Sequence, residues 1–191
     1  MAKNKVNTDI VDKAIIFAVN AHKGIARKGN GLPYIVHPME AVAITATMTE
    51  DQEMLAAAAL HDVVEDTDIT LEDIRREFGD RVAMLVDNES EDKSPGREHE
   101  TWHERKAKAM ERLAKAGKDT KIIAMGDKLS NMRAIYRDYR AIGSKLWDRF
   151  NTKDPKEHAW HYMELLKALS ELNGTEAYFE FKRLVNEIFN P

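Results

Sequence analysis

The stretch that decides the fold is residues 54–66, MLAAAALHDVVED, in which an apolar run leads directly into ionisable side chains. Alanine and leucine have high helix propensity, so this run is predicted to form a buried helix. If the helix continues through Asp66, then His61, Asp62, Glu65 and Asp66 are spaced i, i+1, i+4 and i+5. Their side chains would then lie along one edge of a single helix.

Such a cluster has two interpretations. One imidazole and three carboxylates beside an apolar run are unfavourable unless a positive charge neutralises them. A divalent cation suits them, because neutral imidazole and ionised carboxylate are both good ligands. The alternative is a solvated, acid-rich helix end, which is common in soluble proteins. Because the apolar run continues up to His61, a metal site is the better interpretation.

The composition limits the size of the protein and its partners. Its 191 residues, 43% hydrophobic and 32% charged, are typical of one globular domain, which we expect to span residues 1–191. The formal net charge of −4 gives no reason to expect nucleic acid or an anionic membrane as a partner. The sequence has neither a signal-peptide pattern nor an apolar stretch of membrane-spanning length, so we expect a cytoplasmic protein. It gives no indication of the oligomeric state.

The chain contains no cysteine. Disulfides, a thiol nucleophile, iron–sulfur clusters and thiolate zinc sites are therefore excluded. Any metal must be bound by nitrogen and oxygen ligands, which suits manganese, magnesium, iron(II) or zinc.

The hydrophobic periodicity is helical almost throughout. Capping residues, prolines and glycines delimit predicted helices over 9–23, 70–78, 102–116, 119–139, 155–173 and 175–189, and another begins at Pro38. Residues 81–86 fit a helix or a strand equally well, and residues 88–100 are predicted to form an exposed loop. No alternating strand pattern stands out, so we predict an all-α fold.

Two other positions could complete a metal site. His37 lies immediately before Pro38, where a histidine is often only a capping or packing residue. Asp127 lies within the apolar segment 122–132, where a carboxylate needs a cationic partner, either a side chain or a metal. With His61 and Asp62 they would form a site of two imidazoles and two carboxylates, with room for water.

Two basic clusters are candidates for phosphate binding, because a protein with net negative charge needs a local basic patch for this purpose. One contains Lys23, Arg27 and Lys28 and precedes a glycine-rich turn, and the other is Arg105 and Lys106. From composition alone, a solvated surface is the better interpretation of both.

Several motifs occur in a characteristic order. They are AVNAHKG (18–24), RK (27–28), PYIVHP (33–38), AALHDVVEDT (58–67), FG (78–79), EDK (91–93), Trp102 with RK (105–106), and GDKLSNMR (126–133). Together they cover about two-thirds of the chain. In this order they resemble the HD-type metal phosphohydrolases, in particular the hydrolase domain of RelA/SpoT-type alarmone enzymes and its small stand-alone forms. A His-Asp pair alone would be weak evidence, whereas the ordered set is specific.

The resemblance implies an HD-type helical bundle with one divalent metal, usually manganese. The residues at the family's metal-ligand positions are His37, His61, Asp62 and Asp127. Glu65 and Asp66 match the pair that the family uses to handle the attacking water and its proton. The residues at its substrate-contact positions are Arg27 and Lys28 near the nucleotide and phosphates, Arg105 and Lys106 near the pyrophosphate, and Asn131 and Tyr162 in the nucleotide pocket.

The implied reaction is hydrolysis of the 3′-pyrophosphate of guanosine tetra- or pentaphosphate to GDP or GTP and pyrophosphate. The expected partner is therefore a small-molecule nucleotide. Carboxylates suit proton transfer in such a reaction, and arginine and lysine offset the negative charge of the substrate. Two departures from the family pattern stand out. Gly126 replaces a frequent alanine, a small-for-small change that should spare Asp127, and segment 86–90 replaces a hydrophobic-threonine pattern, which leaves the substrate less defined.

Three other functions remain open. The same chemistry could act on another nucleotide, such as NADPH, and only rates across a set of nucleotides would separate the two. A non-catalytic sensor that binds nucleotide and metal is a second possibility, although every metal ligand and both acid–base candidates are present. A purely structural helical domain with acidic helix ends is the weakest interpretation, because it leaves Asp127 unexplained.

Overall fold

The computed structural model describes residues 7–27, 31–90 and 99–190, and within these ranges the elements are helical and no strand is present. The α-helices are α1 (Asp9–Ala21), α2 (Val36–Thr45), α3 (Gln52–Leu60), α4 (Val63–Asp66), α5 (Leu71–Phe78), α6 (Asp80–Glu89), α7 (Trp102–Lys115), α8 (Lys118–Ile142), α9 (Pro155–Ala168) and α10 (Glu176–Phe189). Two 3-10 helices, η1 (Gly143–Arg149) and η2 (Ser170–Leu172), follow α8 and α9. The all-α prediction is confirmed. Lys28 and the motif at 91–93 lie outside the described residues.

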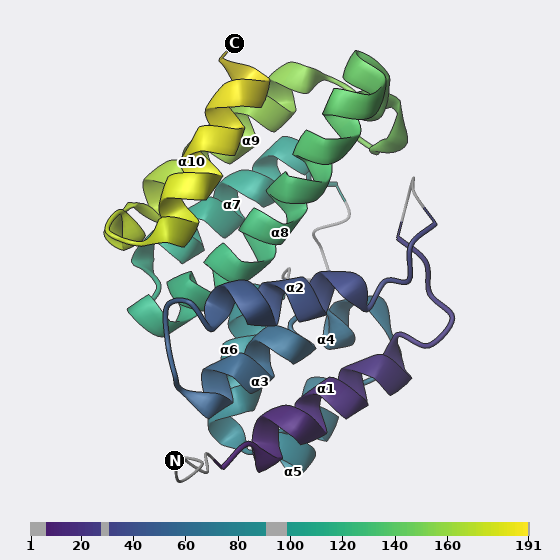
Figure 1. The fold of residues 1–191 in the computed structure, drawn as a ribbon, viewed down its shortest axis with the longest axis vertical. Helices are drawn as coiled ribbons and strands as arrows, with labels where there is room; N and C mark the ends of the chain where they lie inside the picture. The colour runs from purple at the N-terminus through teal and green to yellow at the C-terminus, as the bar shows by residue number, and fades with distance from the viewer. Residues whose placement is uncertain (1–6, 28–30, 91–98, 191) are drawn as a thin grey trace, which may run out of the picture.

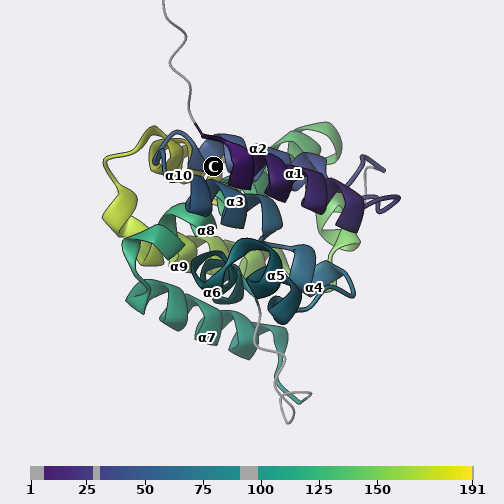
Figure 2. The same ribbon diagram turned by 90° about the horizontal axis from the view of Figure 1, so that it is seen from below.

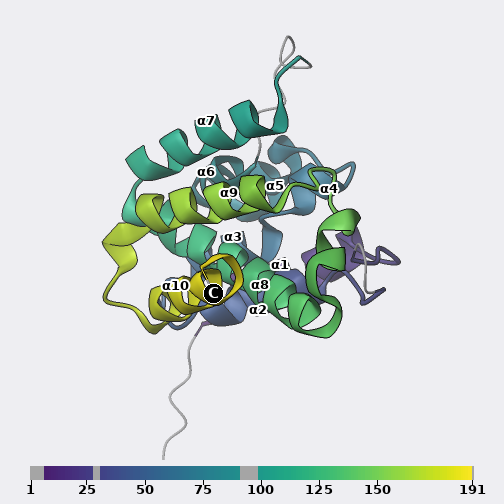
Figure 3. The same ribbon diagram turned by 90° about the horizontal axis from the view of Figure 1, so that it is seen from above.

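The helices are arranged in two groups that meet at α8. Helices α1 to α6 form one half of the molecule and α7 to α10 the other, and the long helix α8 reaches from the second half to α2 (Figure 1). Seen from below, α3 lies between α1 and α6 (Figure 2). Seen from above, α7 and α9 lie side by side (Figure 3). Within the described part of the chain, no helix is both long and apolar enough to span a membrane.

Helix α3 is the core helix that the sequence predicts. Every residue from Met54 to Leu60 is buried, and small alanine side chains allow α1, α2, α6 and α8 to pack against it. The N-cap of the helix is Asp51, whose side chain accepts hydrogen bonds from the backbone N–H groups of Glu53 and Met54. Arg81 of α6 pairs with the same carboxylate at 2.8 Å, so the start of α3 is tied to α6.

Several helix boundaries differ from the predicted ones. Residues 81–86 belong to a helix, α6, which resolves the ambiguity between helix and strand. Helix α2 begins at Val36, two residues before Pro38, which still falls in the first turn where its missing N–H costs little. The prediction of one helix over 155–173 was wrong: α9 ends at Ala168. The hydroxyl of Tyr178 donates to the carbonyl of Leu166, which satisfies an acceptor at that end.

Candidate metal and nucleotide site

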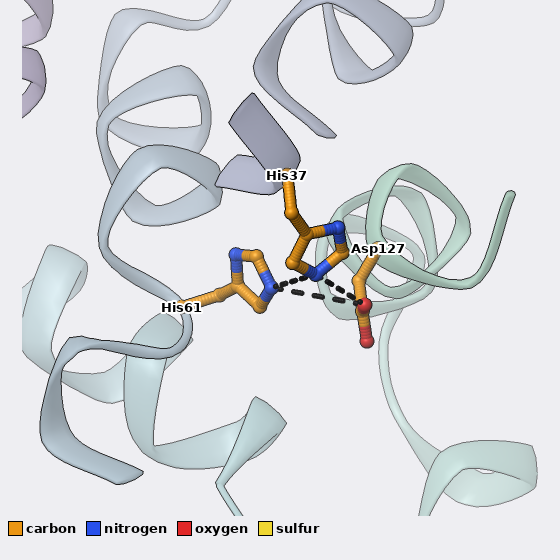
Figure 4. Close-up of side chains that lie close together, drawn as sticks. All are labelled: His37, His61 and Asp127. Carbon is orange, nitrogen blue, oxygen red and sulfur yellow. Dashed lines mark hydrogen bonds and ion pairs between the residues drawn. The ribbon is translucent and has the colours of Figure 1, made fainter. Parts of the chain in front are cut away.

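The four predicted metal ligands converge from three parts of the chain. His37 comes from α2, His61 and Asp62 from the turn after α3, and Asp127 from α8. The Nε2 atoms of the two imidazoles lie 3.2 Å apart, and Asp127 Oδ1 lies 3.2 Å from that of His37 and 3.7 Å from that of His61. Figure 4 shows these three side chains pointing toward one another. Asp62 Oδ2 completes the group at 3.1 Å from His61 Nε2 and 3.4 Å from His37 Nε2.

The core helix does not continue through Asp66, so the condition for a single ionisable helix edge is not met. Helix α3 ends at Leu60, His61 and Asp62 form a turn, and α4 begins at Val63. His61 Nδ1 lies 2.8 Å from the carbonyl oxygen of Ala58, so the imidazole satisfies an acceptor in the last turn of α3 where the helix stops. The four ionisable residues therefore do not lie along one helix edge: Glu65 and Asp66 are on α4, and His61 and Asp62 precede it.

The protonation of His61 shows that the cluster suits a cation. A carbonyl oxygen only accepts hydrogen bonds, so His61 Nδ1 carries the proton and Nε2 of the neutral ring has a free lone pair. That lone pair faces the imidazole of His37 and two carboxylates. Four electron-rich atoms in a buried space need a positive charge between them. Two imidazole nitrogens and two carboxylate oxygens are a ligand set that fits a divalent cation such as manganese, iron(II) or zinc.

The pKa values of His61 and Asp127 also indicate that the cluster favours a positive charge. Burial alone would lower the pKa of His61, but the charges of Asp62 and Asp127 outweigh it and raise the pKa to about 10. Burial alone would raise the pKa of Asp127, but the charge of Lys128 and the contact with His37 hold it well below its usual range. Without a metal, a proton on His61 would therefore supply the positive charge.

Three neighbouring side chains hold the two carboxylates. Tyr34 donates from its hydroxyl to Asp62 Oδ2 at 2.6 Å, and burial together with the charge of Asp62 raises the pKa of Tyr34. Lys128 pairs with Asp127 Oδ2, and Asn131 donates from Nδ2 to Asp127 Oδ1 at 2.5 Å. Sequence reasoning assigned no role to Tyr34 or Lys128, although both lie in the motifs it identified, at 33–38 and 126–133.

A cavity of about 570 Å³ opens beside the cluster. We call the four predicted ligands, His37, His61, Asp62 and Asp127, the metal cluster. Tyr34 and Asp66 lie in the cavity wall, and Tyr34 makes the direct contact with Asp62 of that cluster. Four of the predicted substrate residues also line it: Arg27, Lys106, Asn131 and Tyr162. Its other walls include the aromatic side chains of Trp102, Phe150, His158 and His161. A cavity lined by both basic and aromatic side chains suits a phosphorylated nucleotide.

Arg27 and Asn131 act together in this wall. Arg27 donates from Nη2 to Asn131 Oδ1 at 2.6 Å, while the amide nitrogen of Asn131 donates to Asp127. The two bonds fix which way the amide of Asn131 points. The loop that carries Arg27 is thereby connected to a predicted metal ligand through one side chain.

The remaining predicted residues are placed less directly. Arg105 donates from Nη1 to the carbonyl oxygen of Glu100 at 2.9 Å and does not line either of the two cavities described here. Glu65 lies on α4 next to Asp66. Lys28 lies outside the described residues.

A second cavity, of about 460 Å³, adjoins the first and shares Lys106 and His161 with it. Lys128 and Glu89 are also in its wall. Burial raises the pKa of Glu89 to about 7, because the opposing charge of Lys128 offsets burial only in part. Burial lowers the pKa of His161 to about 3, so its ring is neutral between the two cavities. Glu89 belongs to the segment 86–90 that departs from the family pattern.

Known proteins resemble this chain in both sequence and structure. The HD domain family matches residues 14–153. The guanosine-3′,5′-bis(diphosphate) 3′-pyrophosphohydrolase MESH1 of Drosophila melanogaster is 33% identical over 177 residues, which cover 91% of this chain and 89% of that protein. A guanosine-3′,5′-bis(diphosphate) 3′-pyrophosphohydrolase of Vibrio cholerae is 39% identical over 124 residues. These residues are 64% of this chain but only 17% of that longer relative.

A solved structure agrees over the whole chain. It is described as a metazoan ortholog of SpoT that hydrolyzes ppGpp and plays a role in starvation responses. It superposes with a TM-score of 0.73 and 27% sequence identity, covering 97% of both chains. The chain therefore belongs to the HD domain family and, within it, to the group that contains the MESH1 proteins.

Proposed function

We propose that this protein hydrolyses the 3′-pyrophosphate of guanosine tetra- or pentaphosphate, releasing GDP or GTP and pyrophosphate. The observation that carries the proposal is the His37–His61–Asp127 cluster, with Asp62 beside it, next to a cavity lined by basic and aromatic side chains. The MESH1 relatives are named for the same reaction, and the chain covers most of their length. The longer bacterial relatives match this chain over only 17% and 14% of their own length.

The cation would be bound by His37, His61, Asp62 and Asp127, and we propose manganese. Once bound, it would lower the pKa of a water molecule and offset the charge of the phosphoryl oxygens. The protein's own part is to hold and deprotonate that water. Glu65 and Asp66 of α4 are the carboxylates for this role, and Asp66 lies in the cavity wall where a substrate phosphate would enter.

Binding and orientation of the nucleotide fall to the rest of the cavity wall. Arg27 and Lys106 would offset the phosphate charge, which a protein of net charge −4 does not otherwise attract. The ring of Tyr162 and that of Trp102 would cover the base and exclude water from it. Arg105 would add positive charge from outside the cavity wall, and Lys28 is proposed to do so near the phosphates on the family resemblance alone.

Two substitutions separate metal binding from proton transfer. Asp62→Asn should abolish both manganese binding and pyrophosphate release, because it removes a charged ligand from the cluster. Asp66→Asn should keep manganese binding and lower kcat by roughly 10²- to 10⁴-fold, the usual contribution of a general base. Titration calorimetry and a pyrophosphate assay on both variants give the two readouts. An Asp66→Asn variant with full activity would remove Asp66 from the mechanism.

A comparison of nucleotides tests the substrate. With manganese, the purified protein should release pyrophosphate from guanosine tetraphosphate. The kcat/KM for this reaction should be well above the kcat/KM for hydrolysis of NADPH or of a 3′-monophosphorylated nucleoside. Dephosphorylation of NADPH as the faster reaction would reassign the cavity to that substrate class. Metal binding without turnover of any nucleotide would favour a sensor.

A further inference from the structure

His37 takes part in a chain of hydrogen bonds on the side of its ring that faces away from the metal cluster. Its Nδ1 lies 2.8 Å from Ser130 Oγ, and Ser130 Oγ donates to Glu40 Oε2 at 2.7 Å. Arg133 Nη1 donates to the other oxygen of Glu40 at 3.2 Å. His37 and Glu40 lie one turn apart on α2, and Ser130 and Arg133 lie one turn apart on α8, so the chain crosses the interface between these helices.

The number of hydrogens in this chain determines where the proton of His37 lies. A carboxylate accepts hydrogen bonds and donates none, so the single hydroxyl hydrogen of Ser130 is used on Glu40. Toward His37, Ser130 can then only accept, and Nδ1 must be the donor. In the neutral ring, the free lone pair is therefore on Nε2, the atom that faces His61 and Asp127. A metal ligand needs that lone pair.

The surroundings show that the chain is specific and not a general result of burying a hydroxyl. Ser130 is fully buried, at 0% exposure, and so is Thr45 in the same α2–α8 interface. Among the residues that the structure describes, Thr45 Oγ1 has no hydrogen-bond partner, whereas Ser130 contacts two charged or polar side chains. Arg133 also binds Glu180 of α10 through two bonds, at 2.9 and 2.6 Å, so Arg133 has a second carboxylate partner that does not contact Ser130.

We propose that Ser130 and Glu40 are positioning residues that hold His37 in the tautomer with its proton on Nδ1, and so keep Nε2 available to the cation. This inference rests on the metal-binding role proposed above for His37. It assigns a function to two side chains that neither line the nucleotide cavity nor belong to the metal cluster.

The expected effect is on metal affinity. Ser130→Ala leaves the Nδ1 proton without an acceptor, and Glu40→Gln allows an amide N–H to donate to Ser130, which then donates to His37 and moves the ring proton to Nε2. Each change should raise the Kd for manganese by roughly 10- to 100-fold, the usual effect of losing a partner of a metal-binding histidine. Ser130→Thr, which restores a hydroxyl, should recover part of the loss.

The structure offers a matched control for each variant. Thr45→Val removes a hydroxyl that is as buried as that of Ser130 but has no partner. Glu180→Gln removes the other carboxylate that binds Arg133, with a side-chain exposure of 32% against 34% for Glu40. If the network only held the helices together, Glu180→Gln and Glu40→Gln would weaken manganese binding equally. We expect Kd to remain within about twofold of the parent for both controls.

Two measurements on folded variants decide the proposal. Titration calorimetry with manganese gives Kd, and ¹⁵N NMR of the neutral His37 ring in chelator-treated protein identifies the protonated nitrogen. The proposal is supported if the His37 ring proton lies on Nδ1 in the parent protein and is displaced from Nδ1 in Ser130→Ala and Glu40→Gln. The proposal is overturned if the proton of His37 in the parent protein lies on Nε2. It is also overturned if the variants bind manganese with the same Kd as their controls. If the parent bound no divalent cation, the proposed function would fail, while the NMR tautomer would still decide the role of Ser130 and Glu40.

Discussion

At the scale of single side chains, the hydroxyl of Tyr34 is a direct support of the metal cluster. It donates to Asp62 at 2.6 Å, while the ring packs against His22 and His37. Tyr34→Phe keeps the ring and removes the donor, so the affinity for manganese should fall by roughly tenfold or more. Tyr136→Phe, which removes a similar bond to Glu187 on the surface, is the control. Equal manganese affinity in the two variants, measured by titration calorimetry, would argue against this role of Tyr34.

Glu89 leads to a prediction about pH. Burial raises its pKa from 4.5 to about 7, so the folded protein holds a proton that the unfolded chain has lost in this range. Stability should therefore fall as the pH rises from about 4.5 to about 7. Glu89→Gln should be more stable than the parent above pH 7, by on the order of 1–2 kcal/mol, and equally stable below about pH 4.5. Denaturant unfolding across this pH range is the measurement. A less stable variant above pH 7 would contradict the account.

Single residues also show what a sequence can and cannot specify. Placed in an apolar segment, Asp127 was predicted to need a cationic partner, and the structure supplies Lys128. The type of partner follows from the cost of a buried charge. The identity of the partner depends on which helices lie opposite, and for that reason the bonds from Tyr34 to Asp62 and from His37 to Ser130 could not be predicted.

At the scale of helices, the contact between α2 and α8 places His37 opposite Asp127. Gly126 allows this contact: a Cβ atom at that position would lie 2.4 Å from Thr45 Oγ1 and 2.7 Å from the carbonyl oxygen of Ala41. Glycine does leave Asp127 in the cluster, as expected from its small size. An alanine at position 126 would have no room, because one of the two close atoms, the carbonyl oxygen of Ala41, belongs to the backbone.

Gly126→Ala should therefore move α2 away from α8. We expect a loss of about 1–3 kcal/mol in the free energy of unfolding from overpacking, which outweighs the gain in helix propensity of up to about 1 kcal/mol. Manganese binding should weaken as well, because His37 and Asp127 lie on the two separated helices. Gly174→Ala, where a Cβ would meet no atom within 4 Å, is the control. Unchanged stability and metal affinity in Gly126→Ala would contradict this view of the contact.

The helices also show how far local patterns reach. The capping box at Thr70 and Asp73 and the alanine-rich core helix could be predicted, because they depend on neighbours in the sequence. The break at His61 and Asp62 could not, because helix propensity does not include an imidazole that binds the last-turn carbonyl of Ala58. This break separates Glu65 and Asp66 on α4 from His61 and Asp62, the proposed metal ligands that precede them.

At the scale of the whole molecule, the site depends on how distant segments meet. His37, His61 and Asp127 are far apart in the sequence and approach to between 3.2 and 3.7 Å only because α2, α3 and α8 pack together. No periodicity indicates that contact. The ordered motifs predict it through the resemblance to a family, and the fold agrees with a solved member of that group.

The central claim is that a divalent cation bound by this cluster is needed to release pyrophosphate from the 3′ position of a guanosine nucleotide. The most direct measurement is the rate of pyrophosphate and GDP formation from guanosine tetraphosphate by protein stripped with a chelator, before and after manganese is added back. The account predicts no release from the stripped protein and recovery of both products once about one equivalent of manganese is bound. Equal rates with and without the metal would contradict it.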